Sequence, residues 1–123
     1  EMITTGVDII EIWRVQRVLE RWGQRFLDRI FTEAEQSYCK CRVPNLAARF
    51  AAKEATMKAL GTGVRGVSWK DIEVVRAKSG APSLRLCGRA LERYRSLGIC
   101  DLALSLSHSR DYAVAMVVSN SEF

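Results

Sequence analysis

The sequence predicts one small domain of the α+β class, in which an antiparallel sheet packs on a long helix. Three observations indicate this class. The chain has 123 residues, the length of a single domain. Helix-like and strand-like segments are interspersed along it, and hairpin-type links favour antiparallel pairing of the strands. The hydrophobic fraction of 48% is sufficient for a core. We therefore expect a single domain spanning residues 1–123.

The first third of the chain predicts one strand followed by helices. Residues 3–10 are rich in Ile, Val and Thr and read as a strand that carries Asp8 near its end. Apolar residues at helical spacing predict a helix from residue 11 to about 22, and the pattern continues after Gly23. Thr32 and Glu35 have the spacing of a capping box, so a new helix is expected to begin there.

The rest of the chain predicts a long helix, a hairpin and a final pair of strands. Residues 46–60 are rich in alanine and are followed by Gly61, a natural C-terminal cap. Residues 72–77 and 83–86 read as the two strands of a hairpin. A short helix is expected at 90–97, closed by Gly98, and strands are expected at 102–107 and 112–118.

Composition excludes several classes of function. Nineteen Lys and Arg against fourteen Asp and Glu leave a net charge of +5, which suits an anionic ligand or partner. No apolar run approaches the roughly 20 residues of a membrane-spanning helix, and the start lacks a signal-peptide layout, so we expect a cytoplasmic protein without a membrane partner. Four cysteines and one histidine lack the spacing of a four-ligand zinc site, and the cysteines are expected to be reduced.

The long helix carries two charged residues on or beside an apolar stripe. Phe50, Glu54 and Lys58 follow one another at intervals of four residues, and burying either charge is costly without a partner. A surface ion pair between Glu54 and Lys58 is one interpretation. Asp8 is either an N-cap for the next helix or a neighbour of Glu54. Two facing carboxylates repel unless a cation lies between them, and Mg²⁺ fits a pair of carboxylates completed by water and phosphate.

Residues 61–66 match the pattern G-x-G-x-x-G, but they follow a helix and lead into a strand. A dinucleotide-binding fold requires the opposite order, so we reject that interpretation. Two readings stay open: a helix cap with a plain loop, or a backbone nest whose amides meet an anion.

Five arginines recur at intervals of three or four residues near the start of the chain: Arg14, Arg17, Arg21, Arg25 and Arg29. On a continuous or nearly continuous helix they share one face, which is either a solvated surface or a docking strip for an acidic or phosphate-bearing partner. His108 is either structural or a base or phosphate ligand. No G-x-S-x-G elbow surrounds Ser105 or Ser107, which excludes a serine hydrolase of that type.

Four motifs together resemble the holo-acyl-carrier-protein synthases, the short bacterial-type 4'-phosphopantetheinyl transferases. The motifs are GVDIIEI with Arg14, FTxxE from Phe31, RFAAKEAxxKALGTG from Arg49, and SLSHSxDYAxA from Ser105. They occur over nearly the whole chain and in the order of the family.

The resemblance implies transfer of the phosphopantetheine arm of coenzyme A to a serine of an apo acyl carrier protein, with release of adenosine 3',5'-bisphosphate. It implies an Mg²⁺ ion held by Asp8 and Glu54, with Lys58 near the pyrophosphate as the third catalytic residue. Coenzyme A contacts are implied, besides Lys58, at Arg49, Phe50, Lys53, Gly61, Thr62, Gly63, His108 and Ser109. The carrier-protein surface is implied at Arg14, Arg17, Arg21 and Arg25.

The family further implies a homotrimer with active sites between subunits, and a place in fatty-acid biosynthesis or another carrier-dependent pathway. The proton of the carrier serine has two open acceptors, a metal-bound water and Glu54 acting through one. A non-catalytic carrier-protein or nucleotide-binding module is the alternative function. A nucleic-acid binder is disfavoured because the arginines lack an aromatic stacking platform or a known motif.

Overall fold

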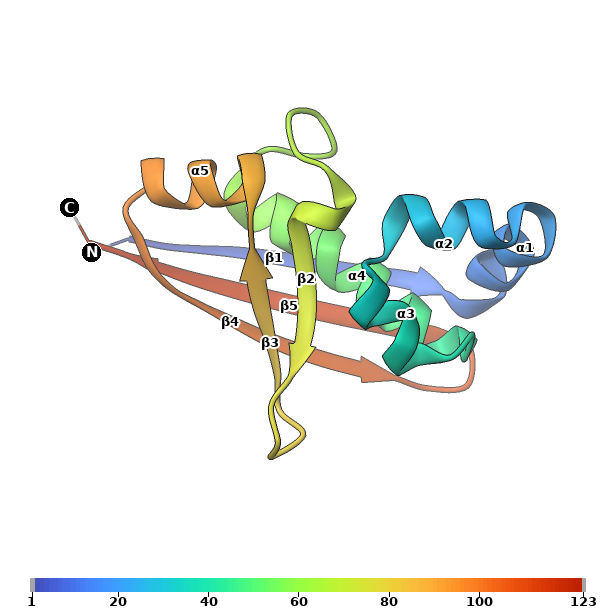
Figure 1. The fold of residues 1–123 in the computed structure, drawn as a ribbon. Helices are drawn as coiled ribbons and strands as arrows, with labels where there is room; N and C mark the ends of the chain where they lie inside the picture. Colours follow the sequence, from blue (N-terminus) through green and yellow to red (C-terminus); the bar gives the residue numbers. More distant parts are fainter. Residues whose placement is uncertain (1, 123) are drawn as a thin grey trace.

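The structure, a computed structural model, describes residues 2–122 and places one long helix across a three-stranded sheet (Figure 1). The elements in chain order are β1 (Met2–Glu11), α1 (Ile12–Trp22), α2 (Gln24–Ile30), α3 (Glu33–Cys39), α4 (Val43–Leu60), the 3-10 turn Trp69–Asp71, β2 (Ile72–Arg76), β3 (Pro82–Leu86), α5 (Gly88–Ser96), β4 (Ile99–His108) and β5 (Tyr112–Ser121). The α+β class predicted from the sequence is confirmed. No helix among these residues has the length and apolar character to span a membrane.

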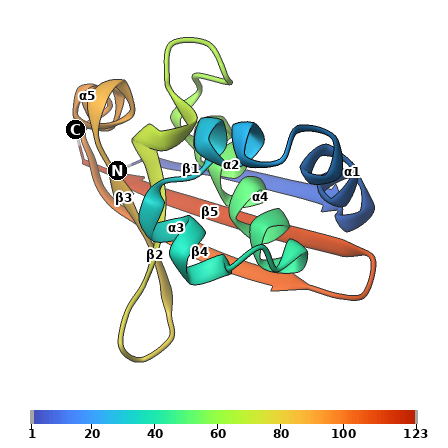
Figure 2. The same ribbon diagram turned by 45° about the vertical axis from the view of Figure 1, so that its right-hand side comes forward.

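Both sheets are antiparallel, as the hairpin links predict. The larger sheet has the order β1-β5-β4, so β5 is its central strand, and the smaller one is the β2-β3 hairpin (Figures 1 and 2). The helix-facing side chains of β5, Ala113, Ala115 and Val117, are fully buried. Strands β4 and β5 run further than predicted because their pairing continues to Ile99 and Ser121.

Local sequence signals at both ends of α4 account for where the helix begins and ends. Pro44 lies in the first turn, where a missing amide proton costs little. Gly61 ends the helix in the left-handed region at φ 72°, and its amide donates to the Lys58 and Met57 carbonyls. The predicted cap is confirmed, and the helix begins three residues earlier than expected.

Strand β1 crosses α4 so closely that only glycine fits at the crossing. A Cβ atom added to Gly6 would lie 1.9 Å from the backbone oxygen of Ala55 and 2.9 Å from the amide nitrogen of Ala59. Ala51, Ala55 and Ala59 are buried and form the small-residue face that admits the strand. Thr4 strengthens the crossing, because its hydroxyl donates to the Ala59 carbonyl over 2.8 Å.

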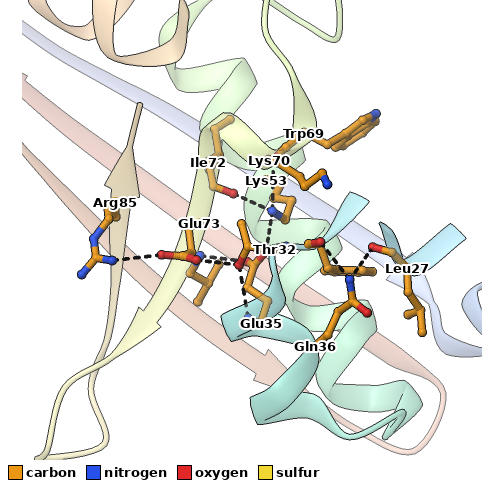
Figure 3. Close-up of polar contacts among 12 residues, drawn as sticks. Leu27, Thr32, Glu35, Gln36, Lys53, Trp69, Lys70, Ile72, Glu73 and Arg85 are labelled. Atoms are coloured by element: carbon orange, nitrogen blue, oxygen red, sulfur yellow. Dashed lines mark hydrogen bonds and ion pairs between the residues drawn. The ribbon is translucent and has the colours of Figure 1, made fainter. Parts of the chain in front are cut away.

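A buried ion pair ties α3 and the hairpin to α4 (Figure 3). The Lys53 ammonium donates to Glu35 Oε1 at 2.7 Å and to the carbonyls of Trp69 and Ile72 at 3.1 and 2.6 Å. Burial lowers the pKa of Lys53, and the nearby Glu35 carboxylate opposes that shift. Glu35 also accepts from the Thr32 and Val74 amides, so the predicted capping box is present and joined to β2.

The first helical segment breaks at Gly23. This residue has φ 54° and ψ −129°, a conformation that separates α1 from α2. The expected single arginine face is therefore divided between two helices.

Replacing Gly6 by Ala tests the crossing. The new methyl group overlaps the α4 backbone, so the free energy of unfolding should fall by about 3 kcal/mol or more in denaturant titrations. Gly80→Ala, in the turn between β2 and β3, is the control: its Cβ meets no atom within 4 Å, and its cost of about 1 to 2 kcal/mol comes from positive φ alone. Equal losses for the two variants would contradict the steric role of Gly6.

Replacing Lys53 by Met leaves the Glu35 carboxylate buried without its counter-charge. The free energy of unfolding should fall by about 3 to 5 kcal/mol. Lys70→Met, at an exposed lysine nearby, should change it by less than about 0.5 kcal/mol. A similar small loss for both variants would show that the buried pair contributes nothing to folding.

Candidate functional site

An open cleft of about 640 Å³ lies where β1, α1, α4 and the start of β5 meet. The crossing at Gly6 holds β1 against α4, so residues from both elements line the same wall. The lining residues are Asp8, Ile9, Ile10, Glu11, Arg14, Phe50, Glu54 and Tyr112. The structure thus brings together the predicted carboxylates Asp8 and Glu54, the predicted Phe50, and the first arginine of the strip.

Lys58 pairs with Asp8, one of the residues that line this cleft. Its ammonium lies 3.2 Å from Asp8 Oδ1 and donates to the Val7 carbonyl over 2.8 Å. Within residues 2–122, Lys58 forms its ion pair with Asp8, so the alternative of a Glu54 to Lys58 surface pair is wrong. The N-cap alternative for Asp8 is also wrong, because the N-cap of α1 is Glu11.

Burial and a neighbouring like charge act together on Glu54. Half-burial is the main cause that raises its pKa, the negative charge of Asp8 raises it further, and Lys58 partly offsets both. A cation between the two carboxylates would favour the charged form of both. No group of three or more His, Cys, Asp and Glu gathers for a metal in the described part of the chain. Two carboxylates with open remaining positions fit Mg²⁺, which retains waters and binds phosphate oxygens.

Two residues of the cleft, Glu11 and Tyr112, were not predicted from the sequence. Glu11 lies beyond Asp8 at the end of β1, and its carboxylate accepts from Trp13 Nε1 and pairs with Arg14 Nε, both at 2.9 Å. Tyr112 opens β5 and pairs with Glu11 in the sheet register. The signal for Glu11 was present in the GVDIIE motif, since an acid at a strand end beside a helix start points to the same edge as Asp8.

A second cavity, of about 270 Å³, is lined by the predicted residues Arg49 and His108. It lies on the β4 side of β5, whereas the first cleft lies on the β1 side. It is lined by Asn45, Ala48, Arg49, Arg76, Leu106, Ser107 and His108, and it shares none of these residues with the first cleft. Arg49 is 2% exposed, its guanidinium stacks 4.3 Å from the Tyr38 ring centroid, and its buried Nε has no hydrogen-bond partner among residues 2–122. The unpaired donor and Arg76 make this cavity suitable for an anion.

Other predicted cofactor residues lie away from both cavities. Lys53 is completely buried and donates to three acceptors, so it is a structural residue and is not part of the proposed cofactor site. The amides of Gly61 and Thr62 donate to Lys58 and Met57 carbonyls as helix caps, which corrects the nest interpretation for these two amides. Ser109 lies exposed in the turn between β4 and β5.

The arginine strip begins at the first cleft. Arg14 lines the cleft, while Arg17 and Arg21 follow on α1 and Arg25 lies beyond the break on α2. Arg29 instead lines a separate cavity with Trp22, Arg25 and Phe26. The four arginines predicted to contact a carrier protein are all exposed.

Comparisons with known proteins agree on one family. Residues 4–117 match the family model described as the 4'-phosphopantetheinyl transferase superfamily. A holo-[acyl-carrier-protein] synthase of Dehalococcoides mccartyi is 53% identical over 118 residues, covering 96% of this chain and 98% of the relative. One of Herpetosiphon aurantiacus is 50% identical over 124 residues, covering 95% and 98%.

Solved structures show the same fold. The Helicobacter pylori holo-[acyl-carrier-protein] synthase, in complex with coenzyme A, superposes with a TM-score of 0.86 at 33% identity, covering 97% of this chain and all of the other. The Neisseria meningitidis enzyme superposes with a TM-score of 0.88 at 38% identity, covering 98% of this chain and all of the other.

Proposed function

The chain belongs to the 4'-phosphopantetheinyl transferase superfamily, and we propose that it transfers 4'-phosphopantetheine from coenzyme A to a serine of an apo acyl carrier protein. The observation that supports this most directly is the cleft lined by Asp8 and Glu54, with Lys58 paired to Asp8, beside an exposed arginine strip. The reaction breaks the bond between the pantetheine phosphorus and the bridging diphosphate oxygen. It forms a bond from that phosphorus to the serine oxygen, releases adenosine 3',5'-bisphosphate, and passes the serine proton to water or, through a water, to Glu54.

Asp8 and Glu54 are the residues that would hold Mg²⁺, which supplies charge neutralisation and a template for diphosphate oxygens when bound. Lys58 holds its ammonium at Asp8 Oδ1 and can donate to the leaving phosphate from the same position. Phe50, stacked on Trp69 with ring centroids 5.0 Å apart, provides a rigid apolar wall of the cleft. Positioning and charge neutralisation carry most of a phosphoryl transfer of this kind, and no covalent enzyme intermediate is needed.

A homotrimer with sites between subunits accounts for two features of the single chain. Arg49 and His108 line a cavity separate from the Asp8 cleft, and two copies can join these halves into one coenzyme A site. The sheet face opposite α4 is also uncovered and apolar: Ile3, Val7, Ile9 and Met116 are each at least 50% exposed. A face of this kind is typical of a subunit interface.

The proposal includes the setting of the reaction. Residues 1–123 form a single transferase domain that acts in the cytoplasm on carriers such as those of fatty-acid biosynthesis. All four cysteines are free thiols, in agreement with a reducing compartment. Coenzyme A supplies an anionic substrate and the acidic carrier an anionic partner, which together match the positive net charge.

Transfer is tested by the mass of an apo carrier incubated with coenzyme A and the protein. A gain of one phosphopantetheine per carrier is expected with Mg²⁺, and none after chelation. Asp8→Asn and Glu54→Gln should each lower kcat/KM at least about 100-fold. Each variant removes a carboxylate ligand of the metal ion that neutralises the negative charge of the diphosphate as its bond breaks. Glu92→Gln on α5 is the matched control and should retain activity. Near-normal transfer by Asp8→Asn or Glu54→Gln would remove that carboxylate from the site.

Charge reversal on the strip tests carrier docking. Arg14→Glu and Arg21→Glu should each raise the KM for the apo carrier about 10-fold, because a repulsive contact replaces an attractive one in the encounter. The KM for coenzyme A should stay unchanged. Arg95→Glu, an exposed arginine on α5, makes the same change in net charge outside the strip. If Arg95→Glu raises the KM for the apo carrier as much as the strip variants do, the effect comes from net charge and the docking role of the strip is contradicted.

A further inference from the structure

Each of two exposed tryptophans lies against the guanidinium groups of two arginines of the strip. The guanidiniums of Arg14 and Arg17 both lie 5.5 Å from the centroid of Trp13, which is 49% exposed. Those of Arg21 and Arg25 lie 5.2 and 5.7 Å from the centroid of Trp22, which is 48% exposed. These distances are typical of cation–π contacts.

Trp22 spans the break between the first two helices. It is the last residue of α1, and Gly23 then turns the chain away from the helical path. Arg21 belongs to α1 and Arg25 to α2, so helical spacing alone does not hold them side by side. Stacking on one indole ring gives both guanidiniums a common support across the break.

Trp13 links the strip to the catalytic cleft. Its indole Nε1 donates to Glu11 Oε2 over 2.9 Å, while Glu11 Oε1 pairs with Arg14 Nε, also at 2.9 Å. Glu11 and Arg14 both line the cleft that holds Asp8 and Glu54. The ring and the carboxylate therefore hold Arg14 in the wall of this cleft.

We propose that Trp13 and Trp22 are positioning residues for carrier recognition, which stack the strip arginines so that their N–H groups face the carboxylates of an acidic carrier helix. The inference rests on the proposed function. A free arginine loses side-chain entropy when it pairs with a carboxylate, and a guanidinium already stacked on a ring loses less. Guanidinium stacking leaves the donor edge of the fork open for bidentate pairing with a carboxylate.

A double-mutant cycle on the complete enzyme separates positioning from direct contact. Trp22→Leu should raise the KM for the apo carrier about 3- to 10-fold and leave kcat and the KM for coenzyme A within about twofold. Trp22→Phe, which keeps an aromatic face, should recover most of this loss. In an Arg21→Gln/Arg25→Gln background, Trp22→Leu should change the carrier KM by less than about twofold, because the groups it positions are gone. The same series at Trp13, in an Arg14→Gln/Arg17→Gln background, should follow the same pattern.

Each failure has its own signature. If Trp22→Leu raises the carrier KM equally with and without the arginines, the indole touches the carrier itself and the positioning role is overturned. A changed KM for coenzyme A in Trp22→Leu would also overturn it, as a general structural effect. If the paired arginine replacements leave the carrier KM unchanged while transfer proceeds, the docking strip and the positioning role both fail but the activity stands. Absence of transfer by the unaltered protein would instead overturn the proposed function.

Discussion

The contact between β1 and α4 at Gly6 is the constraint on which the site depends. A hydrogen atom in place of a side chain lets the strand lie against the backbone of Ala55 and Ala59. Two residues further on, the same strand presents Asp8 to the face of α4 that carries Glu54 and Lys58. The small side chains of the α4 alanines let β1 come close to the helix, and alanine also favours helix formation. A larger residue at position 6 would push β1 away from α4. The distance between the Asp8 and Glu54 carboxylates would increase, and their repulsion would weaken.

The close packing of β1 on α4 brings two negative charges together, and Lys58 offsets only part of their repulsion. Lys58 neutralises Asp8 at 3.2 Å, whereas Glu54 is half-buried with a raised pKa. Such a group is an expected feature of a site that gains a cation with its substrate. The other buried carboxylate of the helical layer, Glu35, is fully engaged by Lys53 and two amides, so its role is structural. Adjacent residues Lys53 and Glu54 thus serve different purposes because they point from α4 in different directions.

Local signals in the sequence were sufficient for most of the fold. The Gly61 cap, the Thr32 and Glu35 capping box and the β2-β3 hairpin each depend on a few neighbouring residues and were predicted. The meeting of Asp8 with Glu54 is long-range, and the sequence supported it only as one hypothesis made specific by the family resemblance. Burial of Lys53 had no local signal, because its partner Glu35 lies on another helix. The broken arginine face was missed since helical spacing continues through Gly23 while the backbone does not.

Under the proposed function, Asp8 and Glu54 hold one divalent cation against the diphosphate of coenzyme A. A crystal structure of the protein with coenzyme A and Mn²⁺, with the ion located by anomalous scattering, tests it most directly. One peak is expected within about 2.3 Å of oxygens from both carboxylates and from the diphosphate. A peak bound to the diphosphate but to neither Asp8 nor Glu54 would contradict it, as would carboxylates that stay paired only with Lys58 while the diphosphate binds elsewhere.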